Sequence, residues 1–142
     1  MTSFGLQIID RDECETLLAA HSFGRVAVWT GDHPAIFPVL YALLDGDVVI
    51  RTAPGEKLEA AVLNHQVAFE IDAAEPATHT GWSVNVVGPA EEIVDTATLE
   101  RARALGLVPW AGDYRDDFVR IRAHHVTGRR IAAHTGALTT GP

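Results

Sequence analysis

The chain has 142 residues, 47% of them hydrophobic, which is enough for one core of ordinary size and requires no second domain. Its formal net charge of −8 disfavours non-specific attraction to nucleic acid or to an anionic membrane, because the long-range field repels phosphate. No apolar run approaches the ~20 residues of a membrane-spanning helix, and the N-terminus has no secretory pattern. We therefore expect a soluble, cytoplasmic protein with neither a nucleic-acid nor a membrane partner.

The first predicted element is a short helix. An acidic run follows Asp10, which is a suitable capping residue, and the helical pattern continues to about Ala20. Two further short helices are predicted over residues 56–64 and 97–105, where apolar residues recur at helical spacing. Helices therefore account for a minor part of the chain.

Strand-like runs account for most of the rest. They cover residues 25–29, 35–43, 47–52, 67–72, 82–87, 118–122 and 126–131, and the last two runs predict one or two late strands that close the sheet. Short turns separate the first three runs, which indicates an antiparallel meander. Because the strands do not alternate with helices, the pattern argues against a doubly wound sheet and favours a barrel, which hides its strand edges by closure. The predicted fold class is mainly β (α+β), with one domain over 1–133 and a flexible tail over 134–142, where Thr, Gly and Pro dominate.

The densest group of candidate functional residues lies between the third strand and the second helix. Arg51 and Thr52 end the strand, and Lys57 begins the helix after a Pro-Gly turn. A guanidinium can grip two phosphate oxygens, an ammonium adds a point charge, and the first amides of a helix donate further hydrogen bonds. The spacing alone leaves two readings open, a phosphate site or a solvated Arg and Lys beside a turn.

Four runs, taken in order, resemble the pyridoxamine 5′-phosphate oxidase-like flavoproteins. They are residues 23–28, 37–43, 50–58 and 82–91, and the likeness extends to about Ile131. Within this family, the chain resembles the short actinobacterial-type and nitroimidazole-resistance-like members more than the oxidase itself. The resemblance implies an FMN-binding, six-stranded antiparallel split β-barrel with a few short helices. It also implies a homodimer with two flavin sites at the interface, each built from both subunits.

The resemblance assigns roles to three groups of residues. One group holds the flavin phosphate, one places its backbone along the isoalloxazine ring, and one polar residue, commonly glutamine in the family, reaches the flavin. The three groups are Arg51, Thr52 and Lys57; Val39, Leu40 and Tyr41; and Ser83.

Two departures from the oxidase pattern bear on the reaction. Glu56 precedes Lys57 where the oxidase usually has two adjacent basic residues, which predicts weaker FMN binding. The oxidase's C-terminal substrate-binding Arg and His have no clear match, so oxidation of pyridoxamine 5′-phosphate is not expected. The predicted function is an FMN-dependent oxidoreductase acting on an unidentified small molecule. Its catalytic residues stay unassigned, because the flavin carries the electrons.

The sequence also allows two other functions. One is a deazaflavin-dependent reductase, and the other is a non-catalytic module that binds flavin or haem. No metal site is predicted, because the adjacent His124 and His125 would point to opposite faces of a strand. A group of arginines near the C-terminus could face a second phosphate, but pairing with the abundant carboxylates is commoner. These arginines are Arg120, Arg122, Arg129 and Arg130.

Overall fold

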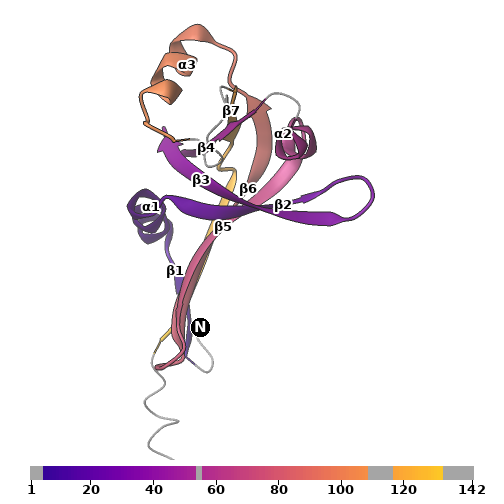
Figure 1. Ribbon diagram of the computed structural model, residues 1–142. Helices are drawn as coiled ribbons and strands as arrows, with labels where there is room; N and C mark the ends of the chain where they lie inside the picture. Colours follow the sequence, from indigo (N-terminus) through magenta and orange to yellow (C-terminus); the bar gives the residue numbers. More distant parts are fainter. Residues whose placement is uncertain (1–4, 54–55, 109–116, 133–142) are drawn as a thin grey trace, which may run out of the picture.

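The computed structural model describes residues 5–53, 56–108 and 117–132, which hold eight strands and three short helices (Figure 1). The strands are β1 (Leu6–Ile9), β2 (Phe23–Trp29), β3 (Pro34–Leu44), β4 (Asp47–Thr52), β5 (Gln66–Glu75), β6 (Thr80–Glu92), β7 (Asp117–Ile121) and β8 (His125–Ile131). The helices are α1 (Arg11–Ala20), α2 (Lys57–Val62) and α3 (Thr96–Arg103). None of these three helices has the length and hydropathy that crossing a bilayer requires.

Six antiparallel strands close into a barrel. Their order is β6-β5-β2-β3-β4-β7, and β7 pairs back with β6. Closure is possible because the long strand β6 pairs with β5 along one edge and with two strands along the other, β8 at residues 81–87 and β7 at residues 90–92. Strands β8 and β1 continue the sheet beyond the barrel, and with the ends of β5 and β6 they form the arm at the bottom of Figure 1. The predicted mainly-β, six-stranded split barrel with short helices is therefore confirmed.

Gly88 marks the point where β6 changes partner. A Cβ at this position would lie 1.7 Å from the carbonyl oxygen of Arg122, so the connection between β7 and β8 can cross β6 this closely only over a glycine. Next to it, the amide of Arg122 donates to the carbonyl of Pro89 at 2.9 Å. The split of the barrel thus depends on one residue without a side chain.

The barrel core follows from the alternation of its strands. In β2, for example, Val26 and Val28 are buried while the residues that alternate with them are exposed. Tyr41 and Phe69 are the largest core residues, and their rings meet edge to face with centroids 4.8 Å apart. The Tyr41 hydroxyl donates to the carbonyl of Leu18 at 2.6 Å, in the last turn of α1, where helix carbonyls lack partners within the helix. Tyr41 therefore fastens α1 to the barrel.

Most predicted boundaries differ from the structure by at most two residues, but β5 (Gln66–Glu75) and β6 (Thr80–Glu92) extend beyond the predicted 67–72 and 82–87. Helix α2 ends at Val62, before the predicted 64, because Leu63 leaves the helix to form a parallel bridge with Ala90. Strand β1 was not predicted; its burial pattern is exposed in three of four residues, and its pairing with β8 positions it. The cap at Asp10 is confirmed, since its carboxylate accepts from the amide of Glu13 at 2.9 Å. The predicted tail over 134–142 lies outside the described residues.

Candidate functional site

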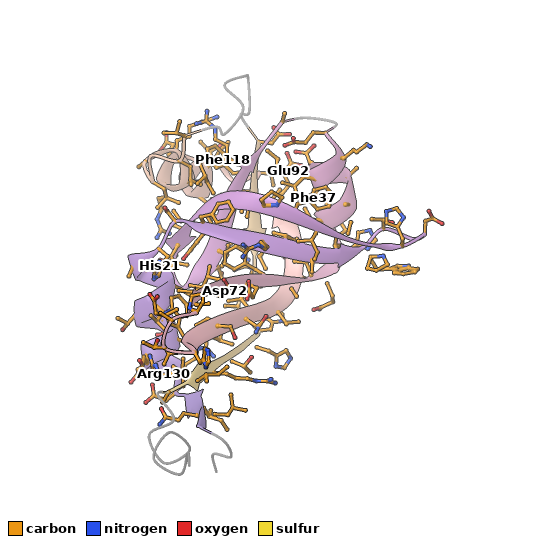
Figure 2. All side chains as sticks on the ribbon, turned by 60° about the horizontal axis from the view of Figure 1, so that its bottom comes forward. His21, Phe37, Asp72, Glu92, Phe118 and Arg130 are labelled. Atoms are coloured by element: carbon orange, nitrogen blue, oxygen red, sulfur yellow. The ribbon has the colours of Figure 1, made fainter. Side chains whose placement is uncertain are left out.

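A groove beside β3 brings together segments that are far apart in the sequence. Its first part has a volume of about 280 Å³. It is lined by residues 37–40 of β3, Arg51 of β4, Glu56, Lys57 and Leu58 at the start of α2, and Leu107 and Val108 after α3. Phe37, labelled in Figure 2, lies on β3 on the side of α2.

The groove continues along β3 into a second hollow of about 520 Å³. The two hollows share Leu40, Leu107 and Val108. The second is also lined by the end of α1, residues 41–43 of β3 and residues 105–106 after α3. His21 and Ser22 add polar side chains. Together the two hollows form one elongated depression, basic at the α2 end and mostly apolar elsewhere.

Arg51 is held firmly at the basic end of the groove. Its guanidinium lies over the ring of buried Phe118, with 5.3 Å from Cζ to the ring centroid, and Nη1 donates to the carbonyl of Leu107 at 2.8 Å. A guanidinium carries five N–H donors in one plane, so it can make several hydrogen bonds at once. The contact with Leu107 also ties the segment after α3 to β4, which gives the groove its second wall.

Lys57 and Glu56 border the same end. Lys57 is exposed and begins α2. The Glu56 carboxylate accepts from the amide of Ala53 at 2.7 Å, and the Glu56 amide donates back to the Ala53 carbonyl at 3.2 Å. Glu56 therefore closes the turn between β4 and α2, a structural role that sequence reasoning missed. Its charge still borders the groove, and its predicted effect on phosphate affinity stays a prediction.

Thr52 is not among the residues that line the groove. It is fully buried, and its hydroxyl donates to Oε2 of Glu59, a carboxylate only 8% exposed, at 2.9 Å. The bond ties α2 to the end of β4 and so positions Lys57. The structure thus places Arg51 and Lys57 together, with Thr52 behind them.

Residues 39–41, predicted to lie along the ring system, do border the groove. Val39 and Leu40 line its first part, and Leu40 and Tyr41 line the second. The Tyr41 side chain is 2% exposed, and its hydroxyl is engaged with Leu18 inside the fold. Burial raises the pKa of Tyr41 to about 12.

Residues 10–130 match the family model described as pyridoxamine 5′-phosphate oxidase. The chain belongs to this family. It is 40% identical over 130 residues to an uncharacterized protein of Mycobacterium tuberculosis, a match that spans 88% of this chain and 85% of the relative.

Solved structures of related proteins have the same fold. The chain is similar to the FAD binding protein from Mycobacterium smegmatis, with 34% identity and a TM-score of 0.77, covering 89% of this chain and 100% of that one. A heme binding protein from the same organism has 24% identity and a TM-score of 0.67, covering 80% of this chain and 51% of that one. The second likeness is one of fold alone.

Ser83, the last residue that the resemblance to this family assigned, lies elsewhere in the subunit. It lines a separate hollow of about 450 Å³ together with Asp72 and Arg129. Strands β5 and β2 separate β6 from β3, so Ser83 is about 14 Å from β3 at ordinary strand spacing. A single subunit does not bring Ser83 to the groove.

The arginines near the C-terminus mostly pair with carboxylates. Asp47 accepts from Nε of Arg120 at 2.9 Å, from Nη1 of Arg122 at 3.3 Å and from the amide of Ala123 at 2.8 Å. Arg130 pairs with Glu13 of α1. For these three arginines the commoner reading is confirmed. Within the described ranges, no three His, Cys, Asp or Glu side chains gather in a way that could hold a metal ion.

Proposed function

We propose that the chain is a flavin-dependent oxidoreductase that binds FMN in the groove beside β3. The observation that carries this proposal is the position of Arg51 and Lys57 at one end of a groove whose other walls are mostly apolar. Such a donor set suits a ligand with a phosphate at one end and a flat ring system at the other. The name of the Mycobacterium smegmatis relative, an FAD binding protein, supports a flavin.

The residues that line the groove have different roles in this proposal. Arg51 grips two phosphate oxygens and Lys57 adds a point charge, while the backbone of residues 39–41 lies along the ring. The apolar side chains of Leu107 and Val108 exclude water from the ring. The flavin, when bound, supplies the electron transfer, and the protein binds and orients it.

The proposal includes a homodimer. A polar residue at position 83 could contact the flavin only if a second copy brought it to the groove, because β5 and β2 separate it from β3 in its own subunit. Two equivalent sites, each completed by the other subunit, would meet this requirement. The family resemblance supports the same arrangement.

A titration with FMN, followed by flavin fluorescence, tests the site. We expect saturable binding at one FMN per subunit, with Kd about 10- to 100-fold weaker in Lys57→Met and Arg51→Gln, the usual effect of losing one charge-assisted hydrogen bond. Riboflavin, which lacks the phosphate, should bind wild type weakly and be insensitive to both substitutions. Arg11→Ala on α1 removes the same charge away from the groove and serves as the control. Wild-type affinity in both groove variants would overturn the site.

The cofactor's identity and its use need two further measurements. Parallel titrations with FAD, a deazaflavin and haem, followed by absorbance, distinguish FMN from the other candidates. A preference for one of those three would replace FMN in the proposal. Reduction of the bound flavin by NADH or NADPH and its reoxidation by an acceptor support an oxidoreductase. A flavin that is neither reduced nor reoxidised would instead indicate a binding module.

A further inference from the structure

One face of the sheet collects most of the large apolar side chains that the described residues leave exposed. This outer sheet face runs across β1, β8, β6, β5, β2 and β3. Six of the eight exposed large hydrophobic residues lie on it, namely Leu6, Ile8, Phe23, Trp29, Ile36 and Ile131. Large apolar side chains that are exposed together on one face of a small protein are typical of an interaction surface.

The strand register places these residues on one side. Paired residues on antiparallel strands project to the same face. One row across four strands contains Ile36, Ala27, Ala68 and Val87, all apolar. On β6, Ser83, Asn85 and Val87 occupy alternate positions, so the Ser83 side chain projects to the same face as this row.

A small charged cluster lies in the next two rows of this face. Nη1 of Arg25 on β2 is 3.6 Å from the carboxylates of both Glu70 and Asp72 on β5 (Asp72 is labelled in Figure 2). One guanidinium therefore serves two carboxylates, which leaves an excess negative charge. Partial burial and the neighbouring Asp72 raise the pKa of Glu70 to about 7, against the opposing effect of Arg25.

The other strands beside Glu70 provide little to balance that charge. In the same row, β6 contributes the uncharged Asn85 and β3 contributes Pro38. Strand β8, one strand further away, carries His125 and Arg129 in the rows on either side. Arg25 and Asp72 are therefore the charged residues nearest to Glu70 on this face.

We propose that two copies of the chain associate through the outer sheet face, and that proton uptake by the Arg25–Glu70–Asp72 cluster controls this association. The inference rests on the homodimer of the proposed function. In a two-fold dimer the same patch meets itself, so two clusters with excess negative charge become buried together. A protonated Glu70 leaves Arg25 and Asp72 as a balanced pair. Association is therefore tighter below neutral pH and weaker above it.

The expected magnitude follows from proton linkage. Burial in the dimer favours the neutral form of Glu70 more strongly than in the monomer, so dimerisation takes up as many as two protons. In the pH range where Glu70 is protonated in the dimer but not in the monomer, each proton taken up changes the association constant by up to about tenfold per pH unit. We expect the dimer Kd to weaken at least about tenfold from pH 6 to pH 8.

Sedimentation equilibrium across this pH range tests the proposal. Glu70→Gln should remove the pH dependence and keep the tight association at pH 8. Glu75→Gln on the same strand, with its side chain on the alternate face, should behave like wild type. If the dimer does not dissociate on dilution, the rate of subunit exchange replaces the Kd. This rate should rise from pH 6 to pH 8 in wild type and in Glu75→Gln, and stay constant in Glu70→Gln.

The outcomes separate this inference from the function on which it rests. A dimer whose association does not change with pH, or a Glu70→Gln variant that keeps the wild-type pH dependence, overturns proton control. A protein that stays monomeric at every pH overturns the dimer as well. An FMN titration on the same samples shows in each case whether the flavin site itself stands.

Discussion

Tyr41→Phe separates the role of this residue in the fold from any role in binding the ligand. The substitution removes only the hydroxyl, which donates to the carbonyl of Leu18 at 2.6 Å inside the fold. That carbonyl lies in the last turn of α1 and has no other way to be satisfied within the helix. We expect lower stability and unchanged flavin affinity.

The cost can be worked from the contact. A buried carbonyl left without its donor costs about 1 to 2 kcal/mol, because the group is desolvated and gains nothing in return. For a domain of this size that corresponds to a fall in Tm of about 3 to 8 °C. The ring itself and its edge contact with Phe69 remain, so no cavity adds to the cost.

The same substitution has a second effect at alkaline pH. Tyrosine ionises near pH 10 in the unfolded chain, whereas burial raises the pKa of Tyr41 to about 12. The unfolded state therefore loses its proton first. Stability present below pH 10 is lost as the pH rises towards 12, by up to about 1.4 kcal/mol per pH unit. A phenylalanine at this position cannot ionise, so the variant should lack this component of the slope.

Urea unfolding at pH 7 and at pH 10 to 11 measures the stability and its dependence on alkaline pH. An FMN titration measures the flavin affinity. Thr96→Val removes a hydroxyl from an exposed position at the start of α3, away from the groove and the outer sheet face, and should change stability by less than about 0.5 kcal/mol. A role of the Tyr41 hydroxyl in the fold is refuted if Tyr41→Phe is as stable as wild type. The expectation of unchanged flavin affinity is refuted if FMN affinity falls more than about fivefold, since the hydroxyl would then act on the ligand.

Two further substitutions test how the barrel is closed. Gly88→Ala would place a methyl group 1.7 Å from the Arg122 carbonyl, so we expect urea unfolding to show a loss of at least about 2 kcal/mol; a wild-type midpoint would contradict the crossing at this residue. Asp47→Asn leaves two arginines without their shared carboxylate and should cost about 2 to 3 kcal/mol in the same assay. Asp32→Asn, on an exposed turn, is its control, and equal effects of the two would argue against the network.

The barrel strands could be predicted because each carries its own signal. Buried residues alternate with exposed ones in β2 and with less buried ones in the first six residues of β5, and the turns between β2, β3 and β4 are short. The four residues of β1 carry no such pattern, since only its last residue is buried. The switch of partner along β6 also has no local signal, because it depends on the Arg122 carbonyl crossing Gly88.

The candidate site was predictable only in part. Arg51 and Lys57 flank a turn, so their proximity follows from short-range geometry. Leu107, which forms the opposite wall and binds Arg51, lies 56 positions away and could not be found from spacing. Thr52 lies beside Arg51 in the sequence, but its hydroxyl donates to Glu59 of α2. The sequence pattern does not encode this contact between β4 and α2.

A crystal structure of the chain with FMN tests the central claim most directly. The account predicts the phosphate between the guanidinium of Arg51 and the ammonium of Lys57, with the ring beside residues 39–41 of β3. A flavin bound with its phosphate away from both cations, for example in the hollow of Ser83 and Arg129, would contradict it.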